Sequence, residues 1–390
     1  MANRVINTVR EDNQVVVVVS AMGKSTDELV SLAKGITERP SKREMDMLLA
    51  TGEQQSIALI SMALIDRGYG AISFTGQQVG ITTDKEHTKA RILNITGVEK
   101  IKEALKKGKI AVVAGFQGVD EEQNITTLGR GGSDLTAVAL GYALKADVCE
   151  FLKDVEGVYT ANPKIVPDAR KIDSLSYDEM LELASSGAQV LYSRSVEFAK
   201  NYDVVLHVRG TFSEKNGTII KKEDGKMEKT VVSGITYNKS EAKVTIKGVP
   251  DRPGIASLIF GKIADAGLNV DIIIQNVSDK GTTDISFTIV RKDAVKAGRL
   301  ISDIVKKVKA KGFTLDEKIG KVSAVGVGMR THTGIASKMF KALADAKVNI
   351  EMISTSEIKI SCVVSEKDTE KAVKALHKVF GLGAKKKKKK

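Results

Sequence analysis

A duplicated segment in the second half of this 390-residue chain restricts its possible folds more than any other feature. Residues 254–271 and 334–351 align at a constant offset of 80, and nine of the 18 aligned positions are identical. An apolar, strand-like run precedes each copy, and two more such runs and a helical pattern follow it. The chain therefore predicts two small units of the order βαββα, each a sheet backed by two helices.

The two copies differ in how they can complete their sheets. The first can add a fourth strand near Gly312 to Leu315, whereas the second runs from its last helix, Thr369 to Phe380, into the C-terminal tail. A strand-like segment, Val231 to Tyr237, stands ahead of the first copy and is the available donor. Because an unpaired sheet edge is unfavourable, we predict that copy one is inserted into copy two.

The first 220 residues have a different build. Runs rich in β-branched residues alternate with helical patterns, which predicts an α/β sheet buried on both faces. The clearest helices are Glu44 to Leu64 and Tyr177 to Ser185, and Ser176 with Glu179 forms a capping-box signature. The predicted strands are Val15 to Val19, Ala71 to Phe74, Ile110 to Ala114, Val148 to Leu152 and Val204 to Val208.

A glycine-rich bend, Gly129 to Asp134, lies between a strand-like run and the helical stretch Thr136 to Leu144. Glycines let backbone N–H groups approach an anion, and the following helix directs its positive end at the same point. Arg130 can bind a carboxylate or phosphate through two hydrogen bonds, and Asp134 can hold Mg²⁺ or orient a nucleophile. We interpret the bend as a phosphate site, although an ordinary turn before a helix can have the same glycines.

Composition excludes several classes of protein. The net charge is +13, but without the six C-terminal lysines 55 basic residues stand against 48 acidic ones, a net charge of +7. Aromatic residues make up 4% and tryptophan is absent, so we expect no nucleic-acid partner. The four histidines lack the spacing of metal ligands.

The cysteines and the apolar runs indicate the compartment. Cys149 and Cys362 lie far apart in apolar segments, which is typical of buried free thiols in a reducing environment. The N-terminus lacks the core of a signal peptide, and no apolar run approaches the ~18 residues that span a bilayer. We therefore expect a cytoplasmic protein with no membrane partner.

Five motifs in order, together with the duplication, make the chain from residue 15 to about 383 similar to the aspartate kinases. They are Val19 to Leu29, Thr51 to Gln54, Ala114 to Gly118, Thr126 to Asp134 and Lys153 to Pro163. The duplicated units resemble ACT regulatory domains, which commonly bind free amino acids where two copies meet. The resemblance implies an α/β fold, an amino-acid-kinase-like three-layer sandwich with a mainly parallel sheet, followed by two ferredoxin-like βαββαβ ACT domains.

The activity that this resemblance implies is the MgATP-dependent phosphorylation of the L-aspartate side chain to 4-phospho-L-aspartate. That reaction belongs to lysine and threonine biosynthesis, with lysine and/or threonine as feedback inhibitors and a homo-oligomer formed through the ACT domains. Aspartate carries two carboxylates and an ammonium group, so its pocket needs a cation and an anion. Arg130 is the candidate for a carboxylate and Glu53 for the ammonium, with hydroxyl groups from Thr26 and Ser133.

The resemblance also implies a role for each of the remaining candidate site residues. Arg130 and Asp134 are the catalytic candidates, Asp134 the candidate Mg²⁺ ligand, and Gly131 and Gly132 the backbone of the phosphate cradle. The ATP-binding candidates are Lys153, Asp154, Tyr159, Lys164, Gln189 and Val190. The effector-binding candidates are Asp251, Gly254, Ile255, Ala256, Asn269, Asp271 and Gln275 in the first copy, and Ile335, Ala336, Ile350, Glu351 and Glu357 in the second.

The expected domains follow from the motifs and the repeat. Residues 1–220 form the kinase domain, 221–242 a linker with the strand donated to the second ACT domain, 243–316 the first ACT domain, 317–383 the second, and 384–390 a poly-lysine tail. Aspartate kinases begin with a strand and a Lys-x-Gly-Gly loop, and neither is present in this sequence. Because that lysine neutralises charge on the transferred phosphoryl group, we expect weak activity.

Two other functions remain open at this stage. A catalytically silent amino-acid sensor could use the ACT pair for binding and the α/β domain as a scaffold. Another enzyme of the amino-acid-kinase fold, such as an acetylglutamate or uridylate kinase, would share the glycine bend, but tandem ACT domains speak against it.

Overall fold

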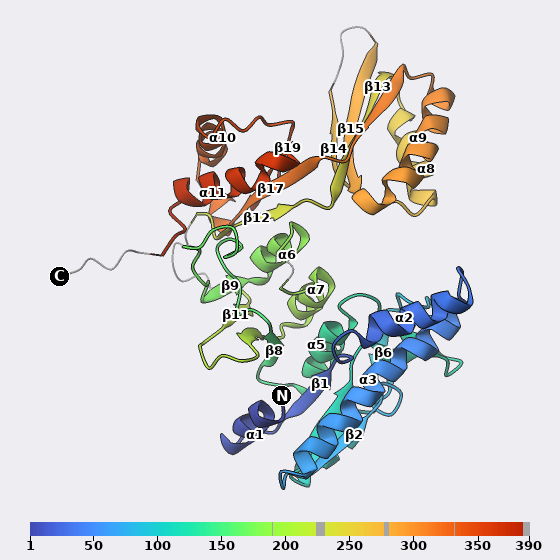
Figure 1. Cartoon of the computed structure of the whole chain (residues 1–390), viewed down its shortest axis with the longest axis vertical. Coiled ribbons are helices and arrows are strands. Elements are labelled where there is room, and N and C mark those ends of the chain that lie inside the picture. The colour runs from blue at the N-terminus through green and yellow to red at the C-terminus, as the bar shows by residue number, and fades with distance from the viewer. Residues whose placement is uncertain (189, 224–230, 277–280, 331, 385–390) are drawn as a thin grey trace, which may run out of the picture. The chain divides into compact units, whose positions relative to one another are not determined.

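The computed structural model describes residues 1–188, 190–223, 231–276, 281–330 and 332–384. Two compact units make up the chain (Figure 1). Unit 1 consists of Met1–Val158, Asp173–Ala184 and Gln189–Gly225, and unit 2 of Tyr159–Ile172, Ser185–Ala188 and Lys226–Lys390. Part of the linker (residues 224–230), the tail from residue 385 and the candidate ATP-binding residue Gln189 lie outside the described residues.

Unit 1 contains a parallel sheet with the strand order β1-β5-β2. The strands are β1 (Val16–Val19), β2 (Ala71–Phe74) and β5 (Ile110–Ala114), close to the predicted ranges. Strand β5 is buried along its whole length, as its β-branched sequence predicts. Helices cover both faces of the sheet, namely α1 (Ala2–Arg10) and α3 (Lys42–Ile65) on one, and α4 (Val98–Lys106) and α5 (Gly132–Leu144) on the other.

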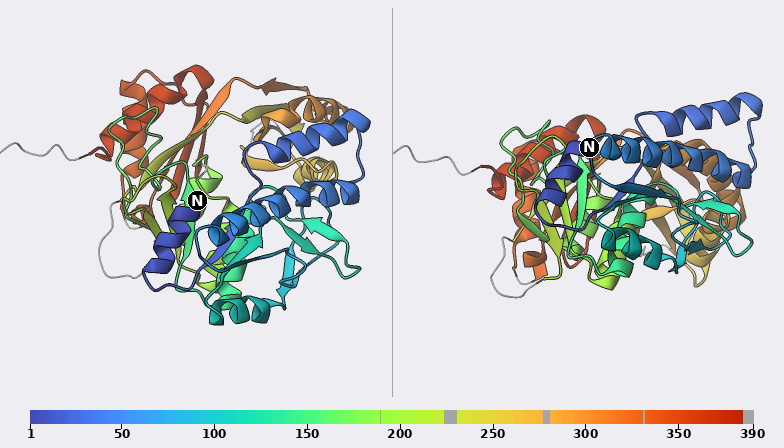
Figure 2. Two further views of the ribbon diagram at one scale, coloured as in Figure 1. Left: turned by 60° about the horizontal axis from the view of Figure 1, so that its bottom comes forward. Right: turned by 90° about the horizontal axis from the view of Figure 1, so that it is seen from below.

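The alternation of side chains along β5 produces this three-layer arrangement. Val112 packs in the core with Ile57 and Leu64 of α3, whereas Ala111 and Val113 pack in the opposite core with residues of α4 and α5. The views in Figure 2 show α3 lying along one face of the sheet. Helix α3 has the length and apolar composition of a membrane span, but its contacts with β2, β5 and β7 are those of a core helix.

Two further sheets complete unit 1. One has the order β4-β3-β6-β7 and was not predicted; its strands are β3 (Ile81–Thr83), β4 (Ile92–Ile95), β6 (Gln117–Val119) and β7 (Ile125–Thr127). The other has the order β8-β10-β11-β9, with β8 (Cys149–Lys153), β9 (Ser174–Ser176), β10 (Leu206–Gly210) and β11 (Thr218–Lys221). The remaining helices are α2 (Ser25–Ile36), α6 (Tyr177–Ser185) and α7 (Ser193–Tyr202).

The predicted capping box at the start of α6 is confirmed. The backbone N–H of Ser176 donates to Glu179 Oε2 at 2.9 Å, and the N–H of Glu179 donates to Ser176 Oγ at 3.2 Å. Cys149 and Cys362 are buried free thiols, as expected, and burial raises the pKa of each to about 12.

Unit 2 contains the two copies of the repeat. The first has the antiparallel order β14-β15-β13-β16, with β13 (Glu241–Pro250), β14 (Val270–Gln275), β15 (Thr282–Val290), β16 (Gly312–Asp316) and helices α8 (Ile255–Asp265) and α9 (Ala294–Val308). The second has the order β12-β17-β19-β18, with β12 (Gly234–Asn238), β17 (Ile319–Val325), β18 (Met352–Thr355), β19 (Lys359–Ser365) and helices α10 (Ile335–Asp345) and α11 (Thr369–Val379). Short 3₁₀ helices span Arg291–Asp293, Val327–Arg330 and Glu366–Asp368.

Strand β12 lies ahead of the first copy in the sequence but pairs antiparallel with β17 of the second copy, with Ile235 opposite Ala324. The segment Tyr159–Ile172, which follows β8 in the chain, also joins the second copy: Ile165 and Val166 pack in its core, and the N–H of Ile235 donates to the carbonyl of Thr160 at 2.8 Å. The second copy is therefore assembled from three separate stretches of sequence.

Candidate active site

The glycine bend connects β7 to α5 in unit 1. Gly129 and Gly131 have φ values of 75° and 74°, in the left-handed region that glycine adopts without strain. Gly131 is the N-cap of α5, so the helix begins at Gly132, within the bend and ahead of the helical stretch Thr136 to Leu144. The N–H groups of Ser133 and Asp134 belong to the first helical turn, where no carbonyl within the helix can accept from them. The bend thus has the geometry of an anion-binding helix N-terminus.

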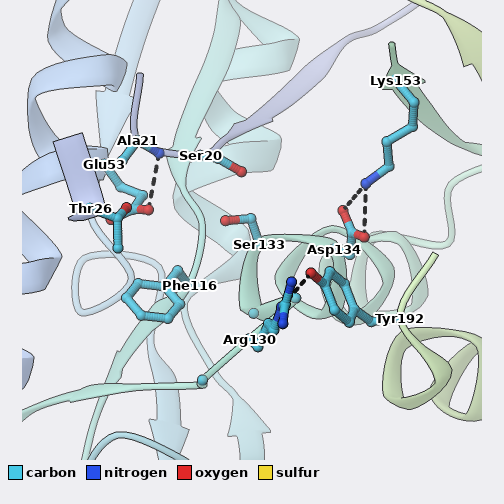
Figure 3. Close-up of a pocket in the computed structure, with 13 residues that line it drawn as sticks. Ser20, Ala21, Thr26, Glu53, Phe116, Arg130, Ser133, Asp134, Lys153 and Tyr192 are labelled. Atoms are coloured by element: carbon cyan, nitrogen blue, oxygen red, sulfur yellow. Dashed lines mark hydrogen bonds and ion pairs between the residues drawn. The ribbon is translucent and has the colours of Figure 1, made fainter. Parts of the chain in front are cut away.

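A cavity of about 270 Å³ opens in front of this bend. Figure 3 shows Glu53 and Thr26 on one side of it and Asp134 and Lys153 on the other, with Ser133 between them. The lining residues are Ser20, Ala21, Thr26, Glu53, Phe116, Gly129, Arg130, Gly131, Gly132, Ser133, Asp134, Lys153 and Tyr192. The pocket therefore brings together all six residues predicted to bind substrate, and adds Lys153 to them.

Glu53 is a buried carboxylate, 3% exposed, on the inner face of α3. Its Oε1 accepts a hydrogen bond of 3.0 Å from the N–H of Ala21, while its buried Oε2 has no hydrogen-bond partner among the described residues. Burial raises the pKa of Glu53 to about 7, although the hydrogen bond from Ala21 opposes the shift. A buried carboxylate oxygen without a partner is costly, so this side of the pocket is suited to a cation.

The opposite side of the pocket contains an ion pair. Lys153, the last residue of β8, places its Nζ 2.9 Å from both Oδ1 and Oδ2 of Asp134 in the first turn of α5. Both side chains are partly buried, with 24% of Lys153 and 14% of Asp134 exposed. From the sequence, Lys153 was predicted to bind ATP and Asp134 to bind a metal ion; their ion pair was not predicted.

Arg130 lies at the rim of the pocket and contacts Tyr192. Its Nε donates to Tyr192 Oη at 2.8 Å, and its guanidinium carbon lies 5.7 Å from the centre of the ring. The ring also covers Gly131, where a Cβ atom would come within 2.3 Å of it. Tyr192 was not among the predicted site residues, because nothing in the sequence connects it with a bend 62 residues earlier.

Two charged residues, one buried and one half-buried, hold the segment that leads into the bend. Asp46 of α3 is fully buried; its Oδ1 accepts from the Thr127 hydroxyl at 2.5 Å, and its Oδ2 lies 2.7 Å from His87 Nδ1. From α7, the Arg194 guanidinium donates to the carbonyl of Leu128 at 2.8 Å. Thr127 and Leu128 directly precede Gly129, so these contacts fix where the bend starts. Neither charged residue was predicted.

The other predicted site residues lie elsewhere. Asp154 follows Lys153 and is exposed, and Val190 lies in the turn before α7. Tyr159 and Lys164 belong to unit 2. Among the described residues, no group of three or more His, Cys, Asp or Glu side chains could hold a metal ion.

The effector candidates lie in unit 2, and two of them form ion pairs. Asp271 pairs with Lys321, and Glu351 pairs with Lys243. Gly254, with a φ of 88°, is the N-cap of α8, which begins at Ile255. Asp251, Ala256, Asn269 and Gln275 lie around this helix start and the following strand. In the second copy, Ile335 and Ala336 begin α10, Ile350 lies just before β18, and Glu357 lies between β18 and β19.

Comparison with known proteins agrees with this architecture. The amino acid kinase family matches residues 1–210, and the ACT domain matches residues 244–303 and 322–380. The chain is 53% identical to the aspartate kinase of Pseudomonas putida over 373 residues, which cover 95% of this chain and 90% of that protein. It is 50% identical to the aspartokinase of Corynebacterium glutamicum over 392 residues, which cover 98% and 92%.

Solved structures show the same fold. Escherichia coli aspartokinase III in complex with aspartate and ADP superimposes with a TM-score of 0.75 at 23% identity, over 97% of this chain and 83% of that one. The same enzyme with lysine and aspartate gives a TM-score of 0.70, also at 23% identity, over 97% and 83%.

These matches, together with the fold, define an ATP-dependent phosphotransferase of the amino acid kinase class that carries two ACT domains. Within that class, the chain belongs to the aspartate kinase family.

Proposed function

We propose that the pocket in front of the glycine bend phosphorylates the side-chain carboxylate of L-aspartate with ATP, giving 4-phospho-L-aspartate. The observation that carries this proposal is the charge pattern of the pocket. On one side lies the buried carboxylate of Glu53, whose Oε2 has no hydrogen-bond partner in the described part of the chain, and on the other lie Arg130, Lys153 and a helix N-terminus. A zwitterionic dicarboxylate needs this combination of charges.

Aspartate would be oriented by its ammonium group. Glu53 Oε2 would accept from the ammonium, while Thr26 and Ser133 would supply hydroxyl contacts and Arg130 would bind a carboxylate. This places the other carboxylate of aspartate near the first turn of α5. Fixed orientation of this kind is a large part of phosphoryl-transfer catalysis.

The transferred phosphate would lie at the bend. The amides of Ser133 and Asp134 are the donors, because the N–H of Gly132 already donates to the carbonyl of Gly129 at 2.9 Å. The positive end of α5 stabilises negative charge at the same place. Asp154, Tyr159, Lys164, Gln189 and Val190 remain the candidates for binding the rest of ATP; their order after the bend supports this assignment.

The pocket would hold Mg²⁺ with the phosphates of ATP. Magnesium usually binds through one or two carboxylates and substrate phosphates, and Asp134 is the carboxylate at the phosphate end. Because both of its oxygens accept hydrogen bonds from Lys153, the ion would share this carboxylate with the lysine. When bound, Mg²⁺ screens charge on the phosphates.

The ACT domains would make the enzyme sensitive to lysine and/or threonine. The helix starts at Gly254 and Gly334 suit the α-carboxylate of an amino acid, and Asp271 and Glu351 suit its ammonium. In support, aspartokinase III of E. coli has been solved with lysine. Effector binding would then compete with Lys321 and Lys243 for these two carboxylates.

The pathway, the location in the cell, the oligomeric state and the domain bounds are also part of this proposal. We infer a role in lysine and threonine biosynthesis, a cytoplasmic location and a homo-oligomer formed through the ACT domains. The proposed domains are residues 1–220, 221–242, 243–316 and 317–383, with the tail from 384. The family matches at residues 1–210, 244–303 and 322–380 support this division.

A hydroxamate assay tests the proposed reaction. Hydroxylamine traps an acyl phosphate, so the chain with ATP, Mg²⁺ and aspartate should form aspartyl hydroxamate, and Arg130→Ala should reduce the yield. Glutamate in place of aspartate is the control. Lysine binding to the chain in calorimetry, without ATP binding or hydroxamate, would instead indicate a catalytically silent sensor.

A further inference from the structure

We propose that Lys153 is a catalytic residue whose ammonium group contacts the phosphoryl group during its transfer, and that Asp134 is the residue that positions it. This inference rests on the proposed function, and it gives the lysine a role in the chemical step rather than in nucleotide affinity alone. It starts from the ion pair at the phosphate end of the pocket (Figure 3).

The position of Lys153 follows from the two elements that meet there. Strand β8 ends at Lys153 and helix α5 starts at Gly132, so a side chain at the strand end can reach the first helical turn. The ammonium therefore lies beside the same turn that presents its N–H groups to an anion. A phosphate bound to those amides would have the lysine at its side.

Asp134 holds the Lys153 ammonium in place but does not occupy all three N–H donors of that ammonium. A lysine ammonium has three N–H donors, and Asp134 accepts at 2.9 Å with each of its two oxygens. Among the described residues no other acceptor for Lys153 is found, and the nearby Phe151 ring, 5.6 Å from Nζ, offers only its face. One N–H donor is therefore available to an oxygen of a ligand in the pocket.

The reaction needs a cation at this place. An oxygen of the aspartate side chain forms a bond to the γ-phosphorus of ATP, the bond from that phosphorus to the bridging oxygen breaks, and its electron pair leaves on ADP. No proton is transferred, so no general base is required. The obstacle is the repulsion between a carboxylate and a phosphate, which a fixed positive charge reduces.

Arg130 does not fill this role as well as Lys153 does. Its Nε is bound to Tyr192, and it is the candidate for holding a carboxylate of aspartate. The ammonium of the substrate is expected beside Glu53, and Lys153 lies on the opposite side of the pocket. The pair is also weak evidence for a purely structural role, because the cost of desolvating two largely buried charges offsets much of their attraction.

Steady-state kinetics of Lys153→Met and Lys153→Arg test the proposal. We expect kcat of Lys153→Met to fall by about 10²–10³-fold, with less than about a threefold change in the KM for aspartate, because the lost contact forms mainly in the transition state. Lys153→Arg keeps the charge and should retain more activity than Lys153→Met. The matched control is Lys200→Met, which breaks an exposed lysine–aspartate pair with Asp178 outside the pocket.

A double-mutant cycle separates catalysis from structure. If Asp134 acts by positioning Lys153, then Lys153→Met with Asp134→Asn should be no slower than the slower of the two single variants. Thermal melting and calorimetric ATP binding report whether each variant is folded and still binds the nucleotide. A folded Lys153→Met variant with kcat within threefold of wild type, or with its loss confined to KM, would overturn the inference. If the wild-type chain makes no hydroxamate, the proposed function itself fails instead.

Discussion

Tyr192 fixes the guanidinium of Arg130, since its hydroxyl accepts a 2.8 Å hydrogen bond from Nε and leaves the terminal nitrogens for a ligand. We predict that Tyr192→Phe raises the KM for aspartate by about tenfold with little change in kcat, because a hydrogen bond to a charged group contributes about 1.5–3 kcal/mol. The ring that covers Gly131 is retained in this variant. Initial rates at varied aspartate and saturating ATP measure the effect.

The control for this variant is Tyr142→Phe, which removes a hydroxyl from an exposed tyrosine outside the pocket. An unchanged KM in Tyr192→Phe would mean that Arg130 does not bind the substrate in this orientation.

Glu53 should make aspartate binding depend on pH. Because burial raises its pKa to about 7, the side chain is neutral in the free enzyme at lower pH and must ionise to bind an ammonium group. We expect kcat/KM for aspartate to fall about tenfold per pH unit below 7. The Glu53→Gln variant should have little activity and lack this dependence, whereas Glu44→Gln, on the exposed start of the same helix, should behave as wild type.

The same carboxylate should reduce stability as the pH rises. Between pH 4.5 and about 7 the unfolded chain releases the proton of Glu53 and the folded chain keeps it, so the free energy of unfolding decreases by about 3 kcal/mol over this range. Glu53→Gln should therefore be more stable than wild type at pH 8 and similar to it at pH 4.5. Urea denaturation at both values measures this, and equal stability at pH 8 would contradict it.

Asp46 should stabilise the residues that directly precede the glycine bend. Its carboxylate accepts from the Thr127 hydroxyl and from the N–H of Thr88, and contacts His87. In Asp46→Asn an amide NH₂ group faces donors in a fully buried site, so we predict a loss of about 2–4 kcal/mol in the free energy of unfolding. Thr127→Val, which removes one of these donors, should cost less. Urea denaturation distinguishes the two variants.

Lys321 should stabilise unit 2 through charge. It is 3% exposed and pairs with Glu241 and Asp271; burial opposes its charge, but these carboxylates outweigh that effect and raise its pKa. Lys321→Met leaves the buried Glu241 without its cation and should lower the free energy of unfolding by about 3–5 kcal/mol. Adding Glu241→Leu should recover part of the loss; a double variant less stable than Lys321→Met would contradict this account.

The sequence was most informative where function or folding depends on local pattern. The buried strand Ile110–Ala114, helix Tyr177–Ser185 and its capping box were predicted closely, because burial and capping act over a few neighbouring residues. The sheet β4-β3-β6-β7 was missed, since its strands have three or four residues of mixed polarity. Such short segments carry no periodic signal.

The residues of the candidate site show the same difference between local patterns and long-range contacts. The glycine bend, Glu53 and Thr26 were predicted from motifs and line one pocket. The contacts of Tyr192 and Asp46 with the bend, in contrast, join residues distant in sequence. Long-range partners of this kind are set by tertiary packing, which no single-sequence pattern encodes.

Isotope transfer tests the proposed reaction most directly. The chain is incubated with ATP, Mg²⁺ and aspartate labelled with ¹⁸O in its side-chain carboxylate, and the product is cleaved with hydroxylamine, which attacks the carbonyl carbon and releases phosphate. If the pocket phosphorylates that carboxylate, the released phosphate contains one ¹⁸O atom, seen as an isotope shift in ³¹P NMR. Phosphate that is released from ATP without ¹⁸O would contradict the account.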